Sequence, residues 1–203
     1  MKKVIVVDTE TGGLDPKNVD ILTIGIVPII NGQIQKGQEF KVQGSRVDPR
    51  AMEINKIDLV EHNKVAVSRA EAFTQVSEYI ESIFPEKDYI LVGHNVIFDI
   101  NFLGQIDPEK KLFSERNIVD TKALTLWFRE QGHLPAKQST SLQAIKDLMN
   151  IYVEGDAHSS LPDAEVTAQL YMIYCHRIHQ MSQAFIAQRE QEFNPEPVDN
   201  FMN

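Results

Sequence analysis

The chain has 203 residues, of which 42% are hydrophobic and 24% are charged, and its formal net charge is −9. This length and composition predict one globular domain with a substantial core. The negative net charge argues against a protein that binds nucleic acid along a broad basic surface. It does not argue against an enzyme that binds a short polyanion at a metal centre.

The N-terminus and the cysteine content predict a cytoplasmic protein. The first apolar stretch, Val4–Val7, is shorter than the roughly 7 to 15 residues of a signal peptide. No apolar run reaches the ~18 residues of a membrane span, so we expect no membrane partner. Cys175 is the single cysteine, whereas a secreted framework would need paired cysteines.

The first half of the chain predicts three antiparallel strands followed by helices. The strands are expected at residues 3–10, 21–30 and 38–42, because Asn31-Gly32 is a strong hairpin signal between the second and the third. Pro28 indicates an edge or a bulge in the second strand. A short helix and a loop are expected at residues 50–62, and a longer helix at 68–84.

The second half predicts strands that alternate with helices. Strands are expected at residues 89–93 and 118–119, and helices at 96–105, 122–131, 141–149 and from about 162 to beyond 178. The pattern as a whole predicts an α/β fold with a mixed five-stranded sheet covered by helices. Residues 1–187 would form the domain and residues 188–203 a mobile polar tail.

Two carboxylates follow the first strand. Asp8 and Glu10 come directly after Val4–Val7, a β-branched run typical of a central buried strand. Side chains two residues apart in a strand point to the same face, so both acids should leave the sheet together. Like charges held this close favour a divalent cation with oxygen ligands between them, although a helix cap or a solvated turn would also accommodate them.

Asp99 is a third candidate because it lies among apolar residues. Its neighbours in the segment include Ile97, Phe98, Ile100 and Phe102. A carboxylate flanked so closely by apolar side chains usually has a partner. The alternative is a solvent-facing acid in the first turns of a helix.

His158 and Asp163 form the last candidate pair. Pro162 suits the first turn of a helix, with Ser160 as its cap, so Asp163 would lie in that first turn and His158 in the preceding loop. From a loop, the imidazole can turn towards the same centre as the carboxylate. A loop histidine bonded to backbone is the simpler alternative.

Together these segments resemble the DEDDh (DnaQ-like) 3′–5′ exonucleases. Their three motifs correspond to Asp8-x-Glu10 after an apolar strand, His94-Asn95-x-x-Phe98-Asp99, and His158-x-x-x-x-Asp163. The resemblance extends over roughly residues 3–180 and implies a ribonuclease H-like fold. The histidine five residues before Asp163 resembles the histidine subclass of the family.

The resemblance implies a two-metal hydrolysis. Asp8, Glu10, Asp99 and Asp163 would hold two Mg²⁺ or Mn²⁺ ions, and His158 would act as general base. The expected reaction removes the last nucleotide of single-stranded nucleic acid, DNA more than RNA, as a nucleoside 5′-monophosphate. The residues expected around the terminal nucleotide are Thr11, Leu14, His94, Asn95 and Phe98.

Several alternatives remain open from the sequence. The fold could serve as a non-catalytic subunit that binds nucleic acid or a polymerase, or the enzyme could act on RNA or short oligonucleotides. The family includes a proofreading polymerase subunit, and residues 180–185 weakly resemble a sliding-clamp peptide, so a DNA polymerase or a clamp is a possible partner. The sequence does not decide between a monomer and a homodimer.

Overall fold

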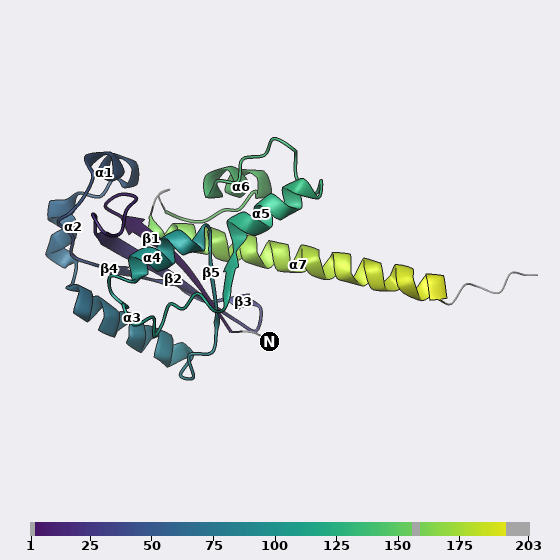
Figure 1. The fold of residues 1–203 in the computed structure, drawn as a ribbon, viewed down its shortest axis with the longest axis horizontal. Helices are drawn as coiled ribbons and strands as arrows, with labels where there is room; N and C mark the ends of the chain where they lie inside the picture. Colours follow the sequence, from purple (N-terminus) through teal and green to yellow (C-terminus); the bar gives the residue numbers. More distant parts are fainter. Residues whose placement is uncertain (1–2, 156–158, 194–203) are drawn as a thin grey trace, which may run out of the picture.

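The computed structural model describes residues 3–155 and 159–193, in which one mixed sheet is covered by helices on both faces (Figure 1). The sheet has six strands in the order β3-β2-β1-β5-β6, and β4 also pairs with β2. The strands are β1 (Val4–Thr11), β2 (Ile21–Ile30), β3 (Gln33–Ile34), β4 (Gln38–Lys41), β5 (Ile90–Gly93) and β6 (Ile118–Asp120). β1 is central, antiparallel to β2 and parallel to β5, as its continuous apolar run predicts.

The helices divide between the two faces of the sheet. They are α1 (Pro49–Asn55), α2 (Leu59–Val65), α3 (Arg69–Ile83), α4 (Val96–Leu103), α5 (Thr121–Glu130), α6 (Leu142–Met149) and α7 (Ser160–Phe193). Ile5 and Val7 of β1 pack in a cluster with residues of α3 and α4, whereas Val4 and Val6 pack with residues of α7. The alternation of side chains along β1 therefore assigns each helix layer to one face.

The expected third strand is present as β4, and a short additional strand, β3, precedes it. Asn31-Gly32 makes the predicted hairpin, but β3 is short, and the chain pairs with β2 again only from Gln38. Pro28 lies opposite this interruption, where its carbonyl accepts a hydrogen bond from the backbone N–H of Gln35 at 2.8 Å. Proline has no N–H to donate, which explains why the outer ladder breaks here. The mixed α/β fold is confirmed, with six strands in place of five.

Helix ends differ from the prediction in two places. Residues 50–62 form two helices, α1 and α2, because Asp48 and Asp58 each cap a separate start. α7 begins at Ser160 and continues through Phe193, so residues 188–193 are helical, whereas the sequence predicted that the helix ends before them. Residues 194–203 lie outside the described part of the chain, and their predicted mobility stays a prediction.

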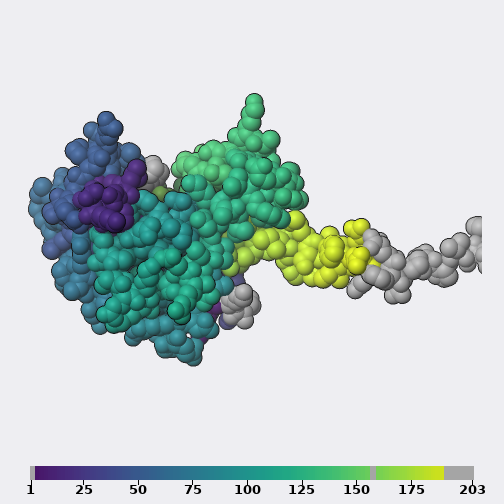
Figure 2. All heavy atoms as spheres, in the orientation of Figure 1, coloured from purple at the N-terminus to yellow at the C-terminus, as the bar shows by residue number. Residues whose placement is uncertain are grey.

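α7 covers the sheet with its first half and extends away from the body with its second half (Figures 1 and 2). Ala164 and Ala168 pack against β1 and β2, and Leu170 and Tyr174 pack against α5 and α6. Among the described helices, none is both long and apolar enough to cross a membrane.

Candidate active site

The C-terminal end of β1 distributes polar side chains to both faces of the sheet. Asp8 and Glu10 continue the row of Val4 and Val6, which faces α7. Thr9 continues the opposite row, which faces α4. This alternation follows from the strand geometry alone and was predicted for the two acids.

Asp163 joins the two acids on the α7 side. It lies in the first turn of α7, where the backbone N–H of Asp163 donates to the carbonyl of Ser159 at 3.0 Å. One carboxylate oxygen each from Asp8, Glu10 and Asp163 can be chosen so that all lie within 4.8 Å of one another. The three side chains are half-buried, so they are accessible from one side. Residues more than 150 positions apart in sequence thus meet at one sheet end.

Asp99 approaches from the other face. It lies in the first turn of α4 and is only 3% exposed. Its Oδ1 accepts a hydrogen bond from the Thr9 hydroxyl at 2.7 Å. Asp99 is outside the compact group of three, but its charge still acts on Asp8 and Glu10.

The proximity of these acids raises their pKa values. Burial is the largest cause for Asp8, whose pKa lies well above its ordinary value, and the charges of Asp99, Asp163 and Glu10 add to it. Burial and the charges of Asp163 and Asp99 raise the pKa of Glu10 to about 8. Burial raises the pKa of Asp99 to about 7, although the Thr9 hydrogen bond opposes the shift. The neighbouring negative charges in the cluster therefore oppose one another's ionisation, which is the condition that a bound cation relieves.

The donor set fits a hard divalent cation. Mg²⁺ and Mn²⁺ prefer carboxylate oxygens, and Asp8, Glu10 and Asp163 supply only such donors. Softer thiolate or imidazole ligands are absent from that group of three. The acidic cluster is thus suited to divalent metal, as the sequence predicted.

His158 lies outside the described residues, so its predicted role stays a prediction. The neighbouring prediction for Ser160 is wrong in one respect. Ser160 is the first residue of α7, and its hydroxyl donates to Glu39 Oε1 at 3.1 Å, where we had expected it to cap the helix.

A family model described as "Exonuclease" (RNase_T) matches residues 5–171 of this chain. The chain belongs to this exonuclease family. The match confirms the resemblance to DnaQ-like enzymes with a ribonuclease H-like fold, and it places the chain among exonucleases that act on nucleic acid. The histidine subclass is a finer assignment that the match does not test.

Two relatives show how the exonuclease domain occurs in other proteins. Ribonuclease T of Buchnera aphidicola subsp. Baizongia pistaciae is 31% identical over 182 residues, which cover 82% of this chain and 81% of the relative. The PolC-type DNA polymerase III of Thermotoga petrophila is 31% identical over 175 residues, which cover 83% of this chain but 11% of the polymerase.

Solved structures share the fold at lower identity. E. coli Exonuclease I in complex with a dT13 oligonucleotide aligns with a TM-score of 0.73 and 15% identity, over 92% of this chain and 44% of that chain. A zinc-bound form of the E. coli Exonuclease I–single-stranded DNA complex aligns with a TM-score of 0.72 and 16% identity, over 93% of this chain and 43% of that chain. This chain thus spans less than half of those proteins, and the likeness shows the fold alone.

The residues expected around the substrate of this exonuclease have different surroundings. Leu14 is 85% exposed and Asn95 is exposed, so both side chains are open to a ligand. Phe98 is half-buried and packs on Phe102 with ring centroids 5.0 Å apart. The Thr11 hydroxyl donates to the carbonyl of Gly13 at 2.6 Å.

His94 is held within the protein. Its Nδ1 lies 2.9 Å from the Thr121 hydroxyl and its Nε2 lies 2.8 Å from the carbonyl oxygen of Thr140. Burial lowers the pKa of His94, so the neutral ring is favoured. Because both ring nitrogens are engaged, His94 holds the segment around Thr140 in place, and its predicted substrate contact stays untested.

Asn55 was not singled out from the sequence. Its side-chain N–H₂ donates to the carbonyl oxygen of Thr11 at 3.1 Å, and a further side-chain hydrogen bond from Asn55 lowers the pKa of Glu10. Asn55 is buried at the end of α1, just before Lys56 adopts a left-handed backbone conformation. A polar residue at a helix end was the available signal, but its partner is far away in sequence.

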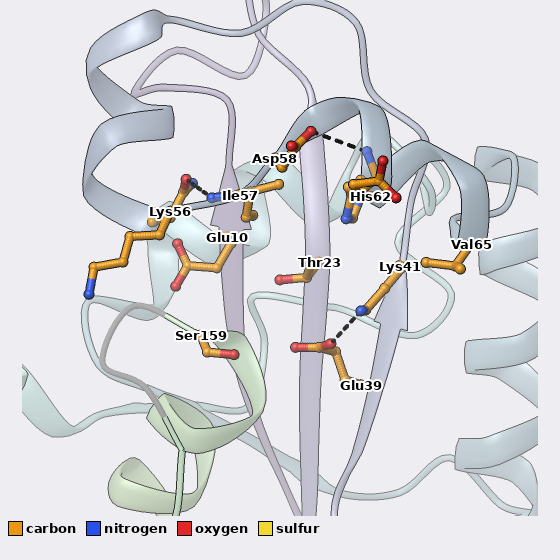
Figure 3. Close-up of a pocket in the computed structure, with 12 residues that line it drawn as sticks. Glu10, Thr23, Glu39, Lys41, Lys56, Ile57, Asp58, His62, Val65 and Ser159 are labelled. Atoms are coloured by element: carbon orange, nitrogen blue, oxygen red, sulfur yellow. Dashed lines mark hydrogen bonds and ion pairs between the residues drawn. The ribbon is translucent and has the colours of Figure 1, made fainter.

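A hollow of about 360 Å³ opens beside Glu10, between β2, β4 and the α1–α2 segment (Figure 3). In the pairing of the strands, Thr23 lies between Glu10 and Lys41. The buried Thr23 hydroxyl makes no hydrogen bond with the described residues. Glu39, Asn55 and Ser159 also line this hollow, which therefore connects the acidic cluster with the β4 side of the sheet.

Proposed function

We propose that this exonuclease hydrolyses the terminal phosphodiester of single-stranded nucleic acid in the 3′–5′ direction and releases nucleoside 5′-monophosphates. DNA is the proposed substrate, because the E. coli Exonuclease I structures that share the fold contain single-stranded DNA. The observation that carries the proposal is the convergence of Asp8, Glu10 and Asp163, with Asp99 beside them.

The four acids occupy different positions around the proposed metal site. Asp8 is the central member, since the charges of Asp99, Asp163 and Glu10 all raise its pKa. Glu10 and Asp163 flank it on the α7 side, and Asp99 lies on the α4 side. The Thr9 hydroxyl donates to one oxygen of Asp99, and the charge of Asp99 acts on Asp8 and Glu10. This places oxygen donors on both sides of Asp8.

These residues would hold two Mg²⁺ or Mn²⁺ ions, which when bound stabilise charge on the attacking and the leaving oxygen of an in-line displacement at phosphorus. His158 would accept the proton of the attacking water, a role suited to an imidazole with an ordinary pKa near 6.5. Leu14, Asn95 and Phe98 would contact the terminal nucleotide, and such apolar and aromatic contacts carry little sequence preference.

The test uses single-stranded DNA and RNA of equal sequence, each labelled at the 5′ end. Incubation with Mg²⁺ or Mn²⁺ should shorten the DNA progressively from its 3′ end. EDTA and the Asp8→Ala variant should both abolish the ladder while the circular dichroism spectrum stays unchanged. Equal turnover in the variant and the parent would contradict the assignment of the site.

The role of His158 has its own test. His158→Ala should lower turnover by about 10²–10⁴, the usual contribution of a general base. The rate should also lose the rise with pH that deprotonation of an imidazole produces. An unchanged rate across pH 6–9 would remove His158 from the mechanism.

RNA is the second candidate substrate, because the family relatives named Ribonuclease T are similar over most of their length. In the same experiment, a faster ladder on RNA than on DNA would favour it. Binding of either strand without any product would favour a non-catalytic subunit, for which the PolC-type relative suggests a polymerase as partner.

A further inference from the structure

The start of α7 rests on one glycine of the sheet. Asp8 on β1, Gly25 on β2 and Glu39 on β4 are direct neighbours across three strands. A Cβ atom at Gly25 would lie 2.2 Å from the carbonyl oxygen of Ser160. No side chain fits between this helix start and β2, so α7 contacts the sheet at a point flanked by Asp8 and Glu39.

Glu39 holds the start of α7 against β2 through a hydrogen bond with Ser160. The Ser160 hydroxyl is fully buried and donates to Glu39 Oε1 at 3.1 Å. Glu39 Oε2 lies 3.8 Å from Lys41 Nζ, which leaves Oε1 for the serine. Figure 3 shows the Glu39 side chain pointing from β4 towards the start of α7, beside Ser159. A hydrogen bond to a carboxylate is stronger than one between neutral groups, so this contact holds Ser160 in a defined position.

One helical turn separates Ser160 from Asp163. In a continuous helix, residues three apart lie on neighbouring positions of one face, so any shift of Ser160 moves Asp163 by a similar amount. Asp163 is the only member of the acidic group of three that comes from outside β1. Its position relative to Asp8 and Glu10 therefore depends on where α7 begins.

We propose that Glu39 is a positioning residue of the active site: through the Ser160 hydroxyl it sets the start of α7 on Gly25 and thereby places Asp163 against Asp8 and Glu10. This inference rests on the proposed function of the acidic group as the metal-dependent exonuclease centre. A carboxylate that is misplaced by about 1 Å can lower turnover by about 10²-fold. Glu39 is outside the acidic group of three, although it lines the same hollow as Glu10 and its charge contributes to the raised pKa of Glu10. Glu39→Gln removes that charge and keeps an acceptor for Ser160, so it separates the two effects.

The experiment compares Glu39→Ala, Glu39→Gln, Ser160→Ala and the double variant Glu39→Ala/Ser160→Ala with the parent. Glu86→Ala, which removes an exposed carboxylate paired with Lys3, is the control. For each protein, Mn²⁺ affinity is measured by isothermal titration calorimetry, and kcat and KM are measured on 5′-labelled single-stranded DNA. Thermal unfolding reports whether each variant is folded at the assay temperature.

We expect Glu39→Ala and Ser160→Ala each to weaken Mn²⁺ binding and to lower kcat by about 10-fold or more, while KM changes by less than about twofold. Glu39→Gln should restore most of both values, because its amide oxygen still accepts from Ser160. The double variant should resemble either single variant, since both remove the same contact. Glu86→Ala should match the parent.

For a parent that binds Mn²⁺, three results would overturn the proposal. The first is a parental kcat and Mn²⁺ affinity in Glu39→Ala. The second is additive losses in the double variant, which would mean that Glu39 acts independently of Ser160. The third is a loss in Glu39→Gln as large as that in Glu39→Ala.

A parent that binds Mn²⁺ but does not cleave would contradict the exonuclease function alone, and the Mn²⁺ affinities would still decide the role of Glu39. A parent that neither binds nor cleaves would contradict both.

Discussion

Asp20 and Asp99 are equally buried, each 3% exposed, but the protein treats their charges in opposite ways. Asp20 accepts hydrogen bonds from the backbone N–H groups of Ser45 and Arg46 and from the Arg46 and Arg69 side chains. Burial opposes ionisation of Asp20, but the hydrogen bonds outweigh it and hold its pKa below the ordinary value. Asp99 accepts from the Thr9 hydroxyl, and its pKa is raised.

The contrast in pKa separates a carboxylate whose charge stabilises the fold from carboxylates whose charges lower the stability of the metal-free protein. This chain can supply arginines to a buried carboxylate, as it does at Asp20. Within the described residues, no ion pair with Lys, Arg or His is formed by Asp8, Glu10 or Asp99. Strongly raised pKa values that cluster in this way are typical of functional sites. The following predictions test this contrast, beginning with the largest effect.

Asp20→Asn should destabilise the protein strongly. It replaces an ionised acceptor of two backbone N–H groups and two arginine side chains by a neutral amide, and losing a hydrogen bond to a charged group costs about 1.5–3 kcal/mol. For a chain of this length, that corresponds to a fall in Tm of about 3–12 °C. Differential scanning calorimetry measures it, with the exposed Asp88→Asn as control. A change within the error of the control would mean that the arginines do not stabilise Asp20.

The acidic cluster should make the metal-free protein less stable as the pH rises. The folded-state pKa of Glu10 is about 8 and that of Asp99 about 7, both above their ordinary values. Between about pH 4.5 and 8 the folded protein therefore binds more protons than the unfolded chain, and the free energy of unfolding falls with pH. Tm in EDTA should decrease across this window, and the slope should be shallower in Glu10→Gln.

Divalent metal should reverse that loss. At a free Mn²⁺ concentration 100 times the dissociation constant, the parent should gain about 2.7 kcal/mol at pH 8. The gain should be smaller in Glu10→Gln, which lacks one of the converging carboxylates. A parent whose Tm is independent of pH and of Mn²⁺ would contradict the raised pKa values of Glu10 and Asp99 and the metal site.

Thr9→Val should have the smallest effect. It removes the hydrogen bond that lowers the pKa of Asp99 and orients its carboxylate, at nearly constant side-chain volume. Loss of such a bond is worth about 1 kcal/mol, so kcat should fall about fivefold. Thr74→Val, at an exposed position of α3, is the matched control and should leave kcat unchanged. An unaltered kcat in Thr9→Val would mean that Asp99 is oriented without Thr9.

Local patterns in the sequence were sufficient where the deciding interactions are local. The alternation along β1 correctly put Asp8 and Glu10 on one face, and the helix predicted at residues 68–84 is α3, which Ser68 caps. The predicted outer strand was found as β4, but the short strand β3 and the gap before β4 were missed, because a gap in pairing depends on the facing Pro28 as well as on the strand itself.

The sequence by itself determined the mixed α/β class, the central β1 strand and the identity of the acids that the motifs contain, because side-chain periodicity and motif spacing are properties of short segments. Only the tertiary structure decided which acids converge as one group, that Asp99 approaches from the opposite face, and that Asn55 and Glu39 support the site. The hydrogen bonds of Asp99, Asn55 and Glu39 join residues that are 44 to 121 positions apart, and Asp163 is more than 150 positions from Asp8 and Glu10. No local pattern encodes them, because they depend on how the helices pack on the two faces of the sheet.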